Sequence, residues 1–185
     1  MGLRKAGAYS KRYARPFTRK SRVSKKSYIK IIPNTKVVKL RMGDLKGFEA
    51  GKYPITLNIR SKEQIQLRDN AIEAVRQYLH RFLTEIIGKD YYLSVNVYPH
   101  HILRENKMIT GAGADRMQTG MALSFGQSMG RAALVKKGQS IFTLAILNTK
   151  HEQVARKLLA SSRAKMPFHM IVDTTYKKKA PVVTA

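Results

Sequence analysis

Cations and aromatic rings, mixed together near the start of the chain, are the residues with the clearest chemical capacity. Residues 1–43 hold 14 Lys or Arg side chains and no acid, and the first carboxylate is that of Asp44. Four aromatic rings lie among these bases, namely Tyr9, Tyr13, Phe17 and Tyr28. Cations neutralise phosphate groups, and aromatic rings stack on bases and riboses. The combination predicts a segment that binds nucleic acid.

Residues 1–27 have almost no aliphatic side chains and no clear periodicity, so they cannot bury a core of their own. We expect an extended arm that contacts phosphates. The alternative is a disordered tail that only adds solubility, but such tails rarely carry several aromatic residues, and Pro16 followed by Phe17 indicates a fixed local path. The candidate ligands in the arm are Arg4, Lys5, Lys11, Arg12, Tyr13, Arg15, Phe17, Arg19, Lys20, Arg22, Lys25 and Lys26.

No catalytic or metal-binding set is apparent in the sequence. None of the five histidines pairs with another at a helical metal-binding spacing, and the neighbours His100 and His101 point apart on an extended chain. Asp115 has no second carboxylate nearby in sequence, and residues 111–113 are too short for a dinucleotide-binding fingerprint. The absence of cysteine excludes disulfides and thiolate zinc sites. We therefore expect no catalytic residue, no metal, no cofactor and no enzymatic activity.

The overall charge indicates a polyanionic partner. The 36 Lys and Arg residues against 11 Asp and Glu residues give a formal net charge of +25, which would make an isolated domain repel itself. Nucleic acid, an anionic membrane surface and an acidic protein are the possible partners. A membrane fits least, because no apolar run reaches the roughly 20 residues that span a bilayer and the start lacks the apolar core of a secretory signal. We expect a soluble cytoplasmic protein without membrane or homo-oligomeric contacts.

These bases and rings need a folded body to position them, and the rest of the sequence predicts one. An apolar content of 43% over 185 residues is enough for one domain with a core. Alternation and turn signals predict strands at residues 28–32, 37–41, 54–60, 93–97 and 168–173. We expect an α+β fold, a two-layer sandwich of mixed or antiparallel strands with two main helices.

The first main helix is the clearest predicted element, with about seven turns. Ser61 and Gln64 form a candidate capping box at its start, and Gly88 provides the stop. Its apolar stripe consists of Ile65, Ile72, Val75, Leu79, Phe82, Leu83 and Ile86. Acids and bases are balanced along residues 61–90, which is typical of a solvated helix face.

Two further elements are expected in the last third of the chain. Residues 133–136 and 140–147 indicate a hairpin that turns at Lys137 and Gly138. A second helix is expected from residue 149 to about residue 163, with Val154 and Leu158 facing inward.

A glycine-rich segment interrupts this pattern at residues 111–130, where five glycines lie among side chains that show no regular packing pattern. A long flexible loop is the simple interpretation. Structureless loops beyond about 12–15 residues are uncommon in compact domains, however, and are usually functional or disordered. In a basic protein we expect such a loop to approach a phosphate backbone closely.

Two sets of segments along the chain form a recognisable pattern: residues 112–121, 124–126 and 132–135, and residues 15–20, 62–74, 98–104 and 106–108. Together they resemble one family, the large-subunit ribosomal proteins that unite protein sixteen of bacteria with protein ten of archaea and eukaryotes. The second set looks like the archaeal branch of that family. The resemblance covers essentially the whole chain. The chain differs from the family pattern in two places. Many members have a basic residue where this chain has Ala122, and a Gly-Lys-Pro where it has Gly126-Gln127-Ser128. Arg131, Lys136 and Lys137 are candidates to replace the phosphate contacts that these two changes remove.

The resemblance implies a hammerhead-like strand arrangement and a place on the large subunit beside the site of incoming aminoacyl-tRNA. Its implied partners are large-subunit rRNA, tRNA and neighbouring ribosomal proteins. An internal loop would point toward the peptidyl-transferase region, where catalysis belongs to RNA; its candidate residues are Arg104, Asn106, Lys107, Met108, Gly111, Gly113, Asp115, Arg116, Gln118 and Thr119. Further candidate RNA contacts are Arg104, Lys107, Arg116, Arg131, Lys136, Lys177, Lys178 and Lys179.

The expected organisation is a single domain, residues 1–185, that consists of the arm at 1–27, a body at 28–174 with a loop at about 100–120, and a basic tail at 175–185. A free nucleic-acid-binding regulator is the second hypothesis, but the charge-balanced helix argues against insertion into a major groove. An rRNA-modifying enzyme would need a cofactor loop or catalytic set. A membrane-active basic protein would need an amphipathic helix with a basic polar face.

Overall fold

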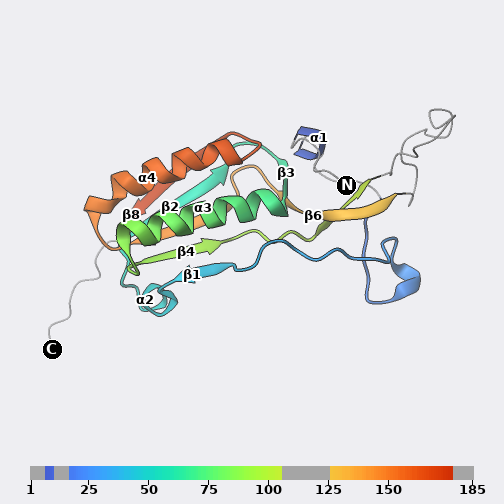
Figure 1. The fold of residues 1–185 in the computed structure, drawn as a ribbon, viewed down its shortest axis with the longest axis horizontal. Helices are drawn as coiled ribbons and strands as arrows, with labels where there is room; N and C mark the ends of the chain where they lie inside the picture. Colours follow the sequence, from blue (N-terminus) through green and yellow to red (C-terminus); the bar gives the residue numbers. More distant parts are fainter. Residues whose placement is uncertain (1–6, 11–16, 106–125, 177–185) are drawn as a thin grey trace.

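The computed structural model describes residues 7–10, 17–105 and 126–176. Its elements in chain order are α1 (Gly7–Ser10), η1 (Ser24–Lys26), β1 (Arg41–Gly43), α2 (Leu45–Glu49), β2 (Ile55–Ser61), β3 (Ile65–Arg68), α3 (Asp69–Ile87), β4 (Tyr91–Val95), β5 (His101–Glu105), β6 (Gln127–Val135), β7 (Ser140–Ile146), η3 (Thr149–His151), α4 (Glu152–Ser161), η4 (Ser162–Lys165) and β8 (Met170–Tyr176). Figure 1 shows an elongated molecule, with the long helices toward one end and α1, β6 and the loop around η1 toward the other.

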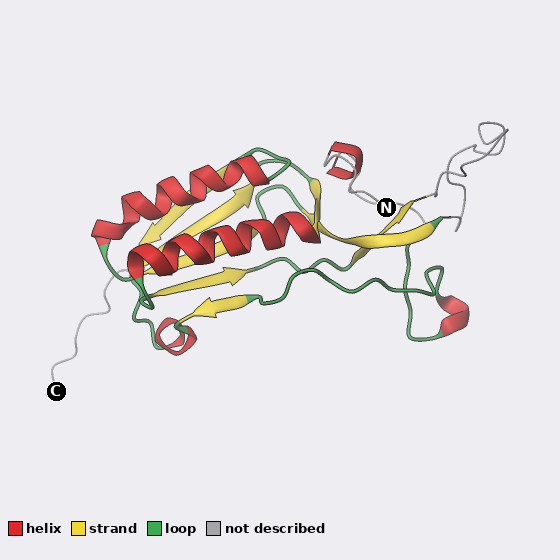
Figure 2. Ribbon diagram, in the orientation of Figure 1, coloured by secondary structure: helices red, strands yellow, loops and turns green. Residues whose placement is uncertain are grey.

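The described strands form two antiparallel sheets. The larger sheet has five strands in the order β1-β4-β7-β2-β8, and the smaller sheet has three in the order β3-β6-β5. Helices α3 and α4 lie side by side over one face of the larger sheet, as Figure 2 shows. The predicted α+β class, with its layer of antiparallel strands and two main helices, is confirmed.

Alternation along the strands of the larger sheet produces its buried face. Leu57, Leu144 and Leu93 are neighbours in register across β2, β7 and β4, and each is 0% exposed. They belong to the main core cluster, which also includes buried residues of α3 and α4. Asn58 follows Leu57 in β2 and pairs with Thr143, which precedes Leu144 in β7. Because side chains alternate along a strand, these two polar side chains point to the other face of the sheet.

Helix α3 begins later than the sequence predicts. The expected first two turns are instead β3 and the loop before it. The predicted capping box is wrong, because Ser61 is 1% exposed and its hydroxyl donates to the Glu63 carbonyl at 2.6 Å. Strand β3 pairs with β6, a partner far away in the sequence, and this pairing overrides the local helical pattern. The predicted stop at Gly88 is confirmed, with a φ of 78°.

Strands β6 and β7 are consecutive but do not pair, so the predicted hairpin is wrong. Because β2 pairs with β7 and β3 pairs with β6, residues 55–68 and 127–146 form one antiparallel ribbon that passes from the larger sheet into the smaller one. We call this the bent ribbon, and its bend lies where the Gly138 N–H donates to the Ser61 carbonyl at 2.7 Å. The Ser61 N–H in turn donates to the Gln139 carbonyl at 3.2 Å. Gly138 has a φ of 77°, which a residue without a Cβ adopts at little cost.

The two strands predicted between residues 28 and 41 are wrong, apart from the last residue, which begins β1. Carboxylates of α3 hold this irregular segment in place of a partner strand. The Lys36 N–H donates to Asp69 Oδ2 at 3.1 Å, and the Val38 N–H donates to Glu73 Oε2 at 3.4 Å. β-branched residues favour a strand only where a partner is available, and here the partner is a helix.

The other predicted elements are confirmed with shifted boundaries. The remaining three strands are β2, β4 and β8, and the second helix is α4 with short 3₁₀ turns at both ends. The buried residues of α4 are Ala155 and Leu159, one position after the predicted Val154 and Leu158. Val154 is 37% exposed, so its predicted inward orientation is wrong.

Candidate nucleic-acid interface

Residues 19–30, here called the basic loop, carry six cations and no acid. The Tyr28 N–H donates to the Arg19 carbonyl at 3.0 Å, which joins the two ends of the loop, and η1 forms a single turn between them. The Phe17 ring meets the Tyr28 ring edge-on with 5.3 Å between centroids. The Arg19 guanidinium carbon lies 5.6 Å from the centre of the same Tyr28 ring. Backbone bonds and ring contacts therefore fix the shape of the basic loop.

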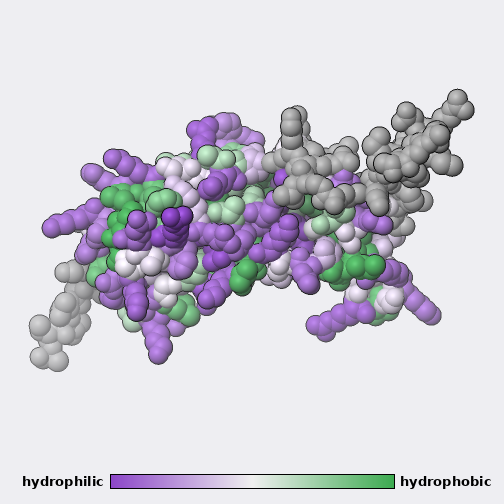
Figure 3. Space-filling model, in the orientation of Figure 1, coloured by the Kyte–Doolittle hydropathy of each residue, from purple (hydrophilic) through white to green (hydrophobic). Residues whose placement is uncertain are grey.

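All six cations of the basic loop are exposed, and they are Arg19, Lys20, Arg22, Lys25, Lys26 and Lys30. In Figure 3 the basic loop stands off the lower right of the body as mostly hydrophilic side chains. Val23 and Tyr28 expose apolar surface between these charges, at 52% and 47%. Six like charges on one short loop repel one another, and phosphates would relieve that repulsion.

Contacts with the smaller sheet hold the segment that follows the basic loop. The Ser128 hydroxyl donates to the Ile31 carbonyl at 2.8 Å, and Arg131 Nε donates to the Pro33 carbonyl at 2.6 Å. Arg131 Nη1 also lies 3.3 Å from the Tyr98 hydroxyl. The sequence predicted Arg131 as an RNA contact. The structure places it partly buried, where it holds the segment after the basic loop at Pro33.

Arg104 and Lys136, two other predicted RNA contacts, lie in different surroundings. Arg104 is in β5 and only 3% exposed, and burial lowers the pKa of its guanidinium. A surface role for Arg104 is therefore not what the structure shows, because its place in the smaller sheet turns the side chain inward. Lys136 is exposed at the bend, at the opposite end of β6 from the basic loop. The structure thus separates Lys136 from the arm residues.

The expectation that the aromatic residues of the arm stack on nucleic acid is wrong for Tyr9. Tyr9 lies in α1, is 5% exposed and packs against Leu103 and Ala132 of the smaller sheet. Its hydroxyl donates to Glu105 Oε2 at 2.6 Å, and Gln66 Nε2 donates to its carbonyl at 3.2 Å. The arm is therefore not extended throughout, and Tyr9 anchors part of it to the body.

Sequence reasoning missed several exposed groups near the basic loop. Further exposed cations on the segment that leads to β1 are Lys36, Lys39 and Arg41. Lys39 and Arg41 were assigned to a strand and Lys36 to no element, although the absence of acids before Asp44 was a signal that all three continue the basic surface. Tyr98 and His100 were also missed; both are exposed, with 4.5 Å between ring centroids, beside Arg131.

The remaining predicted residues lie outside the part of the chain that the structure describes. They are Arg4, Lys5, Lys11, Arg12, Tyr13, Arg15, Asn106, Lys107, Met108, Gly111, Gly113, Asp115, Arg116, Gln118, Thr119, Lys177, Lys178 and Lys179. Within residues 7–10, 17–105 and 126–176, no group of three or more His, Asp or Glu side chains could hold a metal ion. None of the described helices combines the length and the apolar character that crossing a bilayer requires.

The fold and this surface define a class of protein, a basic α+β protein with an apolar core and a loop of exposed cations that carries no acid. The chain belongs to the family of ribosomal proteins L16p/L10e, whose family model matches residues 14–172. It is 39% identical over 168 residues to the large ribosomal subunit protein uL16 of Methanococcus maripaludis strain C7, covering 90% of this chain and 91% of that protein. The uL16 protein of Archaeoglobus fulgidus is 38% identical over 165 residues, covering 89% of this chain and 88% of that protein.

The uL16 protein of Hyperthermus butylicus is similar to the same extent, at 37% identity over 168 residues and 90% of each chain. The resemblance that the sequence segments indicated is thus confirmed, including its archaeal character. The family consists of structural constituents of the large ribosomal subunit and is not a family of enzymes. The cations on the surface of this chain therefore belong to a ribonucleoprotein that works in translation.

Proposed function

We propose that this chain, as a constituent of the large ribosomal subunit, binds large-subunit rRNA beside the site of incoming aminoacyl-tRNA and helps to position that tRNA. The observation that carries the proposal is the basic loop, whose six cations are exposed, free of acids and held in a defined shape. A phosphate backbone neutralises such a surface and releases counterions, which provides much of the free energy of binding.

The rest of the proposed interface follows from the family resemblance and from the charge. The arm at 1–27 and the tail at 175–185 would extend the RNA contacts of a single domain, and neighbouring ribosomal proteins would complete its surroundings in the cytoplasmic ribosome. The internal loop at about 100–120 would point toward the peptidyl-transferase region. Its role would be to position tRNA, since the chemistry belongs to RNA.

Sedimentation and salt-dependent binding test this proposal. A native lysate is run through a sucrose gradient at low and at moderate salt, and the chain is followed with an antibody. The purified chain is then bound to large-subunit rRNA over a range of salt concentrations. The variant K25A/K26A should bind more weakly, and its salt slope should fall by about two ions, because each phosphate contact contributes about one.

Lys89→Ala is the matched control, because Lys89 is exposed at the end of α3 that lies farthest from the basic loop in Figure 1. It should leave the salt slope unchanged. Recovery of the wild-type chain at the top of the gradient at both salt concentrations would refute the ribosomal proposal. Equal slopes for K25A/K26A and Lys89→Ala would remove the basic loop from the interface.

A further inference from the structure

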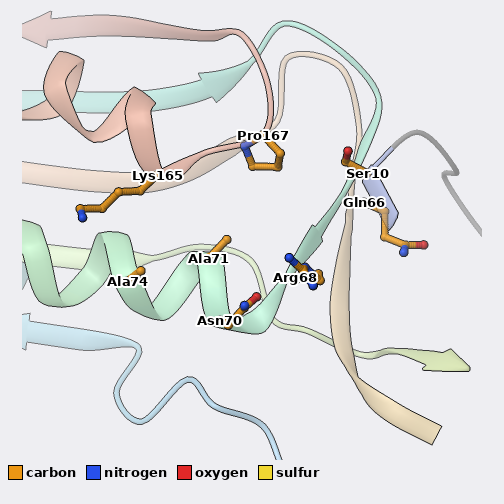
Figure 4. A pocket seen from close by; sticks show the side chains of 8 residues that line it. All are labelled: Ser10, Gln66, Arg68, Asn70, Ala71, Ala74, Lys165 and Pro167. Atoms are coloured by element: carbon orange, nitrogen blue, oxygen red, sulfur yellow. The ribbon is translucent and has the colours of Figure 1, made fainter. Parts of the chain in front are cut away.

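A cavity of about 300 Å³ lies beside the bend, away from the basic loop, and nothing in the proposed interface uses it. Figure 4 shows its walls, which come from α1, β3, the first turns of α3 and the segment after η4. Ala71 and Ala74 lie on α3 below Pro167, so small apolar groups form the inner surface. An apolar surface of this kind accepts a nucleobase or the carbon face of a ribose.

Two cations border the cavity from different elements, Arg68 from β3 and Lys165 from η4. None of the described side chains that line the cavity is acidic. The nearest carboxylate in sequence, Asp69, accepts the backbone N–H groups of Lys36 and Asn70 at 3.1 and 2.8 Å and is 4% exposed. The Asp69 carboxylate is therefore bonded to backbone N–H groups inside the fold. Among the described side chains that line the cavity only Arg68 and Lys165 are charged, and two cations suit a phosphate.

Two residues of the lining have a side-chain amide oxygen that accepts no hydrogen bond from the described part of the protein. Gln66 is 1% exposed and donates from Nε2 to the Tyr9 carbonyl, but its Oε1 has no partner there. The buried Oδ1 of Asn70 likewise has no partner among the described residues. Both oxygens have almost no accessible surface, so they lie behind the wall of the cavity, where a ligand in the cavity does not reach them.

Further cations lead from this cavity across the bend. The Lys62 N–H donates to the His169 carbonyl at 3.1 Å, and Arg163 Nη2 lies 2.9 Å from His169 Nδ1. Lys136 and Lys137 are exposed on the same turn as Gly138. The Gly138 N–H donates to the carbonyl of Ser61, the residue before Lys62. These residues provide a charged path for the phosphates on either side of a nucleotide in the cavity.

We propose that this cavity binds one nucleotide of an RNA strand, as a second contact separate from the basic loop. The base or ribose lies on Ala71, Ala74 and Pro167, and the phosphates on either side of that nucleotide lie against Arg68 and Lys165. This inference rests on the proposed RNA-binding function, which it deepens by assigning a second site.

The test uses the full chain with a fluorescent short oligouridylate. Ala74→Trp fills the cavity at an exposed position, and Lys165→Ala removes one phosphate ligand. Lys157→Ala, at an exposed residue of α4 outside the cavity, is the control. Circular dichroism establishes that each variant is folded. Ultraviolet cross-linking followed by peptide mapping locates the bound uridine on the wild-type chain.

We expect uridine adducts on peptides that contain residues 65–78 or 163–168, and their loss in Ala74→Trp. Ala74→Trp should weaken RNA binding about tenfold, and Lys165→Ala should lower the salt slope by about 0.7 for one phosphate on a single strand. Binding by the variants that matches that of Lys157→Ala, adducts confined to other peptides, or equally tight binding of free uridine monophosphate would overturn the proposal. In those cases the sedimentation result and the K25A/K26A slope still decide the proposed function independently.

Discussion

Replacement of Glu73 by Gln is the most informative single change to the body. Glu73 and Arg76 are each 8% exposed on α3, and Arg76 Nε donates to Glu73 Oε2 at 2.7 Å. Gln77 Nε2 and the Val38 N–H also donate to this carboxylate, at 3.0 and 3.4 Å. Glu73→Gln keeps the shape of the side chain but leaves the Arg76 charge buried without its counterion. Loss of one partner from a buried pair costs about 3–5 kcal/mol, and because the Gln carbonyl can still accept one N–H, we expect about 2–3 kcal/mol.

The dependence on pH gives this prediction a second, independent signature. Arg76, followed by Gln77 and the Val38 N–H, holds the pKa of the Glu73 carboxyl below its ordinary value, although burial acts in the opposite direction. Because the folded pKa is lower than the unfolded one, the stabilisation is complete above about pH 4.3, the ordinary Glu value, and is lost as pH falls through the folded pKa. The free energies of unfolding of the wild type and of Glu73→Gln should therefore converge in acid.

Urea unfolding of the full chain, followed by circular dichroism between pH 3 and pH 7, measures both signatures. Glu85→Gln is the matched control, because Glu85 is exposed on the same helix and its replacement should change stability by less than about 0.5 kcal/mol. A destabilisation at pH 7 no larger than that of Glu85→Gln would refute the reasoning. A difference of constant size down to pH 3 would refute the assignment of the effect to the charge.

Two other changes test the anchoring of the arm and the packing of β1. Tyr9→Phe removes the hydroxyl that donates to Glu105 and should cost about 1–2 kcal/mol in urea unfolding, with faster amide exchange in α1; unchanged exchange would mean that Tyr9 does not anchor the arm. Gly43→Ala should cost more than about 2 kcal/mol, since a Cβ there would lie 2.0 Å from the Tyr91 carbonyl oxygen and φ is 85°. Gly51→Ala, with a φ of 78° but nothing within 4 Å, should cost only about 1 kcal/mol, and equal effects would contradict the steric argument.

Elements whose evidence is local could be predicted from the sequence. The alternation at residues 54–60 predicts β2 because each second side chain enters the core, and the stop at Gly88 follows from its need for a positive φ. The strand at residues 65–68 could not be predicted in the same way. Ile65 continues the spacing of the α3 stripe, although Leu67 does not, and the pairing with β6 decides between strand and helix.

The candidate interface shows the same division between local and distant evidence. The charge of the basic loop is visible as a run of bases without acids, and the structure adds its closed shape. The burial of Tyr9 and Arg104 was not visible, because Arg104 lies in the smaller sheet and Tyr9 packs against it, and the strands of that sheet come from distant parts of the chain. Composition identifies a basic segment, but it does not distinguish a ring that anchors the segment from a ring that faces solvent.

The bent ribbon has a mechanical consequence. Because the same two segments, residues 55–68 and 127–146, supply neighbouring strands to both sheets, the sheets are joined by covalent backbone and not only by side-chain packing. A force applied to the ends of β5 and β6 at Glu105 and Gln127 would be transmitted through the backbone into β2 and β7, beneath α3 and α4. The angle between the two sheets is then set at the bend, where the backbone bonds of Ser61 with Gly138 and Gln139 oppose flexing. Weakening of these bonds would let the smaller sheet move relative to the core.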